Sequence, residues 1–126
     1  MKTIVLFALF VLAAADLENY TTLNDHLDMD ALVGNITAMQ SYVDCFLDRI
    51  PCSEVAASYK RLMPEAVKQA CSRCNANQKY QYGRFLEAVR VQLPIEYDNY
   101  RKHYDPDNKY FDALIKELSN YTTRVD

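Results

Sequence analysis

The sequence predicts an all-α protein, a compact bundle of about six helices in one domain. Glycine is scarce, with only Gly34 and Gly83 among 126 residues, and the Asn-Gly and Asp-Gly pairs typical of tight β-hairpins are absent. Apolar residues recur at helical spacing in several segments, and four prolines divide the chain into lengths that suit single helices. A chain of this length usually forms a single domain.

The helices can be placed in order along the chain. Asp28 and Ser53 are suited to cap the helices that follow them, because their side-chain oxygens can accept hydrogen bonds from free backbone N–H groups. The apolar stripes are Ile36, Met39, Val43, Phe46 and Leu47; Phe85, Leu86, Val89 and Leu93; and Phe111, Leu114, Ile115 and Leu118. The predicted helices span 28–34, 36–48, 54–62, 64–76, 78–92 and 95–104, and the third stripe adds one near 109–120.

The first fifteen residues have the pattern of a secretory signal peptide. Lys2 precedes an apolar run from Ile4, which ends in small residues at 13–15. The run is too short to span a bilayer, which requires about 20 residues. We therefore expect a signal peptide at 1–15, a mature helical domain at 16–126, and a secreted, extracellular protein.

The charge distribution excludes one class of partner. The formal net charge is -3, and it becomes -4 when Lys2 is removed with the signal peptide. No run of Lys and Arg exceeds two residues, whereas nucleic-acid binding requires a clustered basic face. We expect a monomer that binds no nucleic acid and, after cleavage, has no membrane anchor.

Four cysteines follow the spacing C-x6-C-x18-C-x2-C and allow three disulfide pairings. Cys45 and Cys52 flank a predicted turn, and Cys71 and Cys74 are expected on one face of a helix, so the local pairs 45–52 and 71–74 are favoured. Zinc binding would require a second C-x2-C pair or nearby histidines. A redox C-x-x-C would be expected after a strand, and none is predicted. No metal site is therefore expected.

This cysteine frame resembles that of the insect chemosensory proteins, the OS-D family, and the resemblance covers nearly all of the mature chain. The flanking segments agree with it. They are Asn19-Tyr20-Thr21, Tyr42-Val43-Asp44-Cys45, Leu62-Met63-Pro64-Glu65-Ala66-Val67, Cys71-Ser72-Arg73-Cys74 with Gln78-Lys79, and Tyr104-Asp105-Pro106-Asp107.

The resemblance implies six helices around an apolar tunnel, the same two local disulfides, and binding of long-chain lipids and pheromone-like or odorant-like compounds. The chain departs from the family pattern at several positions. Tyr97 stands where a tryptophan is usual, Thr37 replaces an arginine, and Glu54 and Ala56 replace the usual Pro and Gly. A divergent member need not share the ligand preference of better-matched relatives.

The resemblance and the apolar stripes together suggest ligand-binding residues. Tyr42 and Tyr97 match family positions associated with the tunnel, and a tyrosine hydroxyl could orient an alcohol or ester. The others are expected to point inward from the stripes, although a buried aliphatic residue can equally be plain core: Ile36, Met39, Val43, Phe46, Leu62, Val67, Leu86 and Val89.

Three sequons for N-glycosylation begin at Asn19, Asn35 and Asn120, and at most the two terminal ones are expected to be used.

No arrangement of His, Cys or acidic residues suggests catalysis, so neither an enzyme nor a cofactor is expected. Two functions remain. The first is a carrier of small hydrophobic molecules, and the second is a secreted developmental or signalling protein that acts through a protein partner.

Overall fold

The computed structural model describes residues 19–123, in which seven helices and no strand are found. The helices are α2 (Met29–Val33), α3 (Ile36–Phe46), α4 (Glu54–Lys60), α5 (Met63–Lys68), α6 (Ala76–Gln92), α7 (Pro94–Tyr104) and α8 (Phe111–Leu118). The all-α prediction is confirmed, and the helix expected near 109–120 is present as α8. The predicted signal peptide, residues 1–15, lies outside the described residues.

Side-chain caps explain where several helices begin. Asp28 accepts a hydrogen bond from the backbone N–H of Ala31 at 3.1 Å, and Ser53 does the same for Ala56 at 3.1 Å, as predicted. Asn75 and Gln78 form a reciprocal capping box at the start of α6. These bonds satisfy backbone donors that the first helical turn leaves free.

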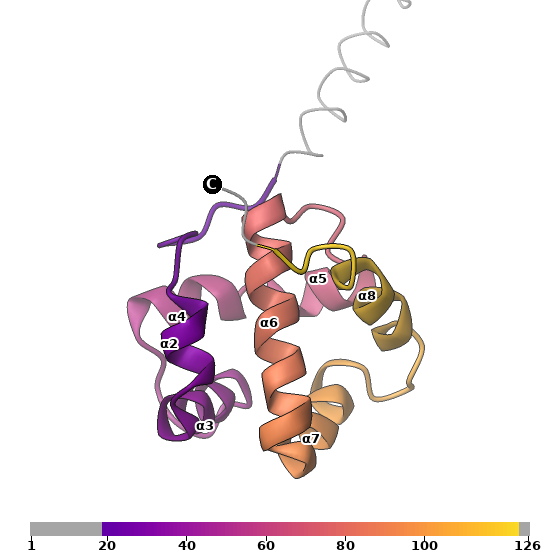
Figure 1. The fold of residues 1–126 in the computed structure, drawn as a ribbon. Coiled ribbons are helices and arrows are strands. Elements are labelled where there is room, and N and C mark those ends of the chain that lie inside the picture. Colours follow the sequence, from indigo (N-terminus) through magenta and orange to yellow (C-terminus); the bar gives the residue numbers. More distant parts are fainter. Residues whose placement is uncertain (1–18, 124–126) are drawn as a thin grey trace, which may run out of the picture.

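Helix α6 is the central element of the bundle (Figure 1). It packs against α2 on one side and against α7 and α8 on the other, while α3 packs against α2 and α4. Helix α5 contacts both α7 and α8. Several apolar side chains of α3, α5, α6, α7 and α8 have almost no exposure, namely Met39, Val43, Val67, Leu86, Val89, Tyr100, Phe111 and Leu114.

The predicted helix at 64–76 is wrong in its second half. Helix α5 ends at Lys68, and Ala70 then adopts a left-handed backbone with φ of 51°. The N–H of Cys71 donates to the carbonyl of Ala66 at 2.8 Å, which is the long-range bond of a Schellman motif. Glycine usually occupies the left-handed position of this motif, so Ala70 gives no sign of it in the sequence.

The predicted disulfide pairing is confirmed, but the prediction that Cys71 and Cys74 lie within a helix is wrong. Cys71 and Cys74 are bonded, with 5.1 Å between their Cα atoms, but they lie in the turn after α5 instead of within a helix. Cys45 and Cys52 are also bonded, again with 5.1 Å between Cα atoms. Each bridge therefore fixes the chain locally, next to a helix end.

Helix α3 ends in the same way as α5. Asp48 has φ of 64°, and the N–H of Arg49 donates to the carbonyl of Asp44 at 2.8 Å. A Schellman motif commonly pairs two apolar side chains at these positions. Here Arg49 and Asp44 instead form an ion pair at 2.9 Å.

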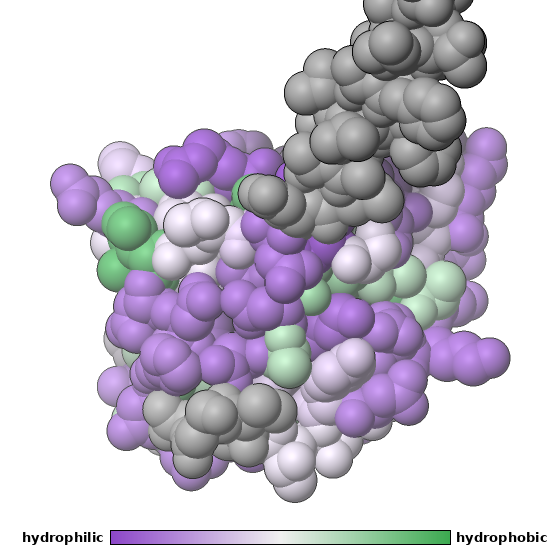
Figure 2. Space-filling view, turned by 90° about the horizontal axis from the view of Figure 1, so that it is seen from above, coloured by the Kyte–Doolittle hydropathy of each residue, from purple (hydrophilic) through white to green (hydrophobic). Residues whose placement is uncertain are grey.

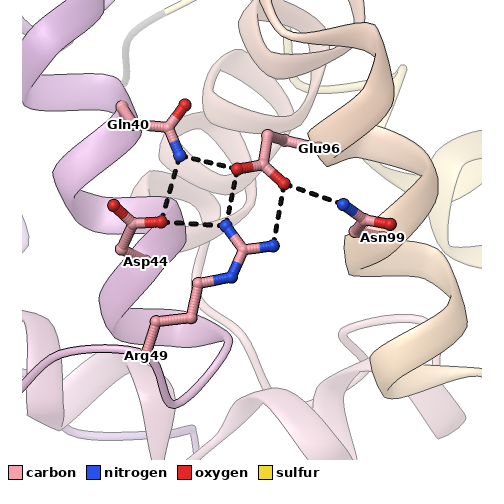
Figure 3. Close-up of polar contacts among 5 residues, drawn as sticks. All are labelled: Gln40, Asp44, Arg49, Glu96 and Asn99. Carbon is pink, nitrogen blue, oxygen red and sulfur yellow. Dashed lines mark hydrogen bonds and ion pairs between the residues drawn. The ribbon is translucent and has the colours of Figure 1, made fainter.

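Arg49 also connects this turn to the first turn of α7 (Figure 3). Its guanidinium donates to both oxygens of Glu96, at 2.6 and 3.0 Å. Gln40 and Asn99 donate to the same carboxylate at 2.6 and 2.9 Å. The hydrogen bonds from Arg49 in particular lower the pKa of Glu96 to about 2.

Candidate functional site

A cavity of about 70 Å³ lies among α2, α3, α4, α5 and α6. The segment at residues 20–27, here called the strap, covers it from the N-terminal side. Helix α4 contributes Tyr59, and the apolar lining comes from the strap, α2, α3, α5, α6 and the residue before α5: Leu27, Met29, Leu32, Phe46, Leu62, Met63, Ala66 and Phe85. Cys71 and Cys74 line it as well, so one disulfide is part of the wall.

Two glutamines of α6 hold the strap in place. Gln78 donates from its amide to Thr22 Oγ1 at 2.9 Å and to the Tyr20 carbonyl at 3.2 Å. Gln81 donates to the carbonyl of Asp25. Both side chains are buried, at 4% and 5% exposure, so their polar atoms need these partners. The amides that line the cavity are therefore already paired with the strap.

Tyr59 and Tyr20 tie the strap to α4 and α5. The hydroxyl of Tyr59 lies 2.7 Å from the Asn24 carbonyl and 2.7 Å from Gln81 Oε1. Burial raises the pKa of Tyr59 to about 12, so this phenol stays neutral at physiological pH. The hydroxyl of Tyr20 donates to Glu65.

Three aromatic rings form one end of the cavity. Phe46 and Phe85 meet edge to face with centroids 5.5 Å apart, and Tyr42 lies 5.9 Å from Phe46 and 6.5 Å from Phe85. Such edge-to-face contacts are favourable and fix the rings relative to one another. Within residues 19–123, the hydroxyl of Tyr42 has no hydrogen-bond partner. The other hydroxyl and amide groups of the lining are paired, and Tyr42 is the exception.

Tyr82 also lines the cavity and points its polar end toward α7. Its hydroxyl pairs with that of Tyr100, a fully buried residue of α7. Burial raises the pKa of both phenols, so neither ionises at physiological pH. The surface facing the cavity is therefore mainly carbon, and it can do little chemically beyond holding an apolar molecule.

The structure brings three of the ten predicted ligand residues to this cavity, namely Tyr42, Phe46 and Leu62. Five others have at most 1% exposure and pack in the core without lining it: Met39, Val43, Val67, Leu86 and Val89. A helical stripe identifies which side of a helix is buried. It does not identify which buried residues face an empty space.

Ile36 and Tyr97 lie elsewhere. Ile36 is the first residue of α3 and is 53% exposed, so the prediction that it points inward is wrong. The N-cap of Asn35 fixes the helix phase there and leaves Ile36 facing solvent. Tyr97 is half-buried and packs edge to face against Phe111 with centroids 5.8 Å apart, on the side of α7 and α8.

Sequence reasoning missed the strap and the α6 glutamines. Tyr20 and Gln78 were noted only as family matches, and Gln81 not at all. A signal for Gln78 was available, because Asn75 followed three residues later by a glutamine is a capping-box pattern. No local pattern marks Gln81, whose partners Asp25 and Tyr59 are remote in sequence.

No group of three or more His, Cys, Asp and Glu side chains within 19–123 is arranged to hold a metal ion. None of the helices there is long and apolar enough to cross a membrane.

Comparison with known proteins gives a consistent result. Residues 20–112 match a model of the insect pheromone-binding family A10/OS-D. Ejaculatory bulb-specific protein 3 of Drosophila melanogaster is 28% identical over 107 residues, which cover 85% of this chain and 83% of that protein. Putative odorant-binding protein A10 of Drosophila melanogaster is 24% identical over 86 residues, covering 68% of this chain and 56% of that protein.

A solved structure shares the fold. It is that of a chemosensory protein in complex with bromo-dodecanol, with a TM-score of 0.70 and 22% sequence identity. The similarity covers 78% of this chain and 98% of the other.

Proposed function

The chain belongs to the insect pheromone-binding family A10/OS-D, and from this premise we propose that it is a carrier of small hydrophobic molecules. The ligand occupies the cavity among α2 to α6 and the strap. The observation that supports this most directly is the cavity itself, whose wall is mainly carbon because its amides are paired with the strap. Each methylene moved from water into such a space contributes about 0.8 kcal/mol.

The size of the cavity limits what it holds without rearrangement. At about 70 Å³ the cavity is well below the roughly 300–1,000 Å³ of most small-molecule pockets. The related structure contains bromo-dodecanol, a twelve-carbon alcohol. We infer that longer ligands widen the cavity. Met29 and Met63 in its wall are flexible side chains that can adapt to this.

The ligand contacts in this proposal come from Tyr42, Phe46 and Leu62 among the predicted residues. We propose that the unpaired hydroxyl of Tyr42 bonds an alcohol or ester group, since a phenol can both donate and accept a hydrogen bond. Met39, Val43, Val67, Leu86 and Val89 form the packed layer behind the wall and would meet only a ligand that widens it.

The setting we propose is extracellular. The signal peptide predicted at 1–15 and the two disulfides both fit a secreted protein, since disulfides persist in oxidising compartments. The carrier acts as a monomer, without a cofactor and without catalysis. No observation in residues 19–123 favours action through a protein partner.

The test is uptake of an apolar fluorescent probe by delipidated protein, followed by displacement with aliphatic alcohols. Ala66→Leu adds three carbons to the cavity wall and should weaken probe binding at least tenfold, because Ala66 is buried and lines the cavity. Fluorescence titration measures the dissociation constant.

Ala57→Leu on α4 is the matched control, since Ala57 is half-buried but does not line the cavity. It should bind the probe as the parent does. Circular dichroism confirms that each variant is folded. Helical, delipidated parent protein that takes up no apolar probe would rule out the carrier.

A further inference from the structure

The same tripeptide, Asn-Tyr-Thr, occurs near both ends of the described chain, at 19–21 and 120–122. In both copies the tyrosine is half-buried, while the asparagine before it and the threonine after it are exposed. Asn-x-Thr is the acceptor sequence for N-linked glycans, and both the Asn and the Thr must be free of the fold for a glycan to be tolerated.

A cation holds the first tyrosine against the molecule. The guanidinium of Arg73 lies over the ring of Tyr20, 4.9 Å from its centroid. The backbone N–H of Tyr20 donates to the Arg73 carbonyl at 2.9 Å, and its hydroxyl donates to Glu65. Because the tyrosine is fixed inward, Asn19 and Thr21 are directed to solvent.

The second tyrosine is held in the same way. The ammonium of Lys79 lies 4.8 Å from the ring centroid of Tyr121 and is paired with Glu117 at 2.8 Å. The backbone N–H of Tyr121 donates to the Leu118 carbonyl at 3.0 Å, so the chain after α8 is anchored at this point. Asn120 and Thr122 on either side are exposed.

Both tripeptides adjoin the first turn of α6. Gln78 bonds the Tyr20 carbonyl, and the next residue, Lys79, holds Tyr121. The two asparagines therefore lie at one end of the molecule, the end where α6 begins (Figure 1). The face seen there in Figure 2 is mainly hydrophilic, as expected of a surface that can lie beneath a sugar.

The third sequon is built differently. Asn35 caps α3, and its side-chain oxygen accepts the Ala38 N–H at 3.1 Å. Its middle residue, Ile36, is 53% exposed and is not held inward. Asn35 therefore serves as the internal comparison.

We propose that Asn19 and Asn120 are N-glycosylation sites, and that their glycans stand side by side at the end of the molecule where α6 begins. This rests on the extracellular setting of the proposed function, because the modification is made during secretion. The donor is a lipid-linked oligosaccharide diphosphate. The amide Nδ2 forms a bond to the anomeric carbon, the bond from that carbon to the diphosphate oxygen breaks, and Nδ2 loses one proton.

The experiment is expression of the full chain, with its own first fifteen residues, in insect cells. Secreted protein is treated with a peptide N-glycosidase that tolerates core fucose, and its mass is compared before and after. Release converts each glycosylated Asn to Asp, so peptide mass spectrometry should find Asp at 19 and 120. Asn19→Gln and Asn120→Gln should each remove one glycan, and the double variant should remove both.

Asn35→Gln is the matched control and should leave both glycans in place. Secreted protein without glycan at Asn19 or Asn120, or with glycan at Asn35 alone, overturns the proposal. Protein that stays inside the cell unmodified overturns it too, and also contradicts the extracellular setting. A secreted, unmodified protein that still binds the apolar probe leaves the carrier function standing.

Discussion

Phe85 shows how a single side chain can set what the cavity accepts. It is 5% exposed, lines the cavity, and meets Phe46 edge to face at the aromatic end. Phe85→Leu removes three non-hydrogen atoms from this wall, which is room for about one more methylene. We expect the preferred alcohol in a homologous series to become about one carbon longer, as measured by competitive displacement of the probe.

Phe111→Leu is the matched control for this prediction. Phe111 is fully buried but packs against Tyr97 and Tyr100, away from the cavity. Both variants should lose stability, by less than the roughly 3–5 kcal/mol of a buried Phe→Ala change. Only the change at Phe85 should alter chain-length preference; an equal shift in both variants would mean that general loosening is the cause.

For single residues, the sequence predicted which side chains are buried better than it predicted which of them line the cavity. Phe46 and Leu62 were correctly expected inside and do line the cavity, while Val43 and Val89 are equally apolar and pack in solid core. What separates the two groups is which neighbouring helix lies opposite each side chain. That depends on tertiary packing, which no helical period contains.

Among the helices, the ends of α3 and α5 show a feature that the sequence does not reveal. Both close with a left-handed residue that is not glycine, Asp48 and Ala70. A left-handed backbone costs an alanine about 1–2 kcal/mol relative to the right-handed form. Ala70→Gly should therefore stabilise the protein, by about 0.5–1 kcal/mol after the greater entropy of glycine in the unfolded chain is counted. Urea denaturation measures the change.

The opposite result is expected within a helix. Ala57→Gly in α4 should cost about 1 kcal/mol, because Ala57 lies in regular helix. If Ala70→Gly destabilised the protein as much as Ala57→Gly does, the left-handed turn after α5 would be wrong.

The extent of six predicted helices came close to the structure because caps, prolines and stripes mark their ends. The end of α5 had no such mark.

Acid stability is a property of the whole molecule, and Glu96 contributes to it by joining the turn after α3 to α7. Its folded pKa of about 2 lies below its usual value of 4.5. The stabilisation is therefore fully present above pH 4.5 and is lost as the pH falls toward 2. Glu96→Gln should cost about 1–2 kcal/mol at pH 7, since its main partner Arg49 is partly exposed.

Urea denaturation of the parent and of Glu96→Gln at pH 7, 4 and 2.5 measures this. The two proteins should differ most at pH 7 and converge at the lowest pH. Glu54→Gln, on the exposed first turn of α4, is the control and should change little at any pH. If the free energies of unfolding of the parent and of Glu96→Gln differed by the same amount from pH 7 to 2.5, the ionised Glu96 carboxylate would not be the source of the stabilisation.

For the molecule as a whole, the all-α class, the local disulfides and the order of helices followed from the sequence and from its family resemblance. The position of the cavity did not. It depends on the strap, which has no regular secondary structure, and on hydrogen bonds such as that from Gln78 to Thr22 across 56 positions of sequence. Contacts of that range leave no periodic trace along the chain.

The absence of a side chain at Gly83 has a mechanical consequence. A Cβ placed there would lie 3.4 Å from the Cβ of Leu118, so α8 rests directly on the back of α6. At 100° per residue, Gly83 faces away from the side on which Gln78, Gln81 and Phe85 line the cavity. Helix α6 is thus supported by α8 on the side away from the cavity. When a long ligand enters, we expect α2 and the strap to yield while α6 stays still.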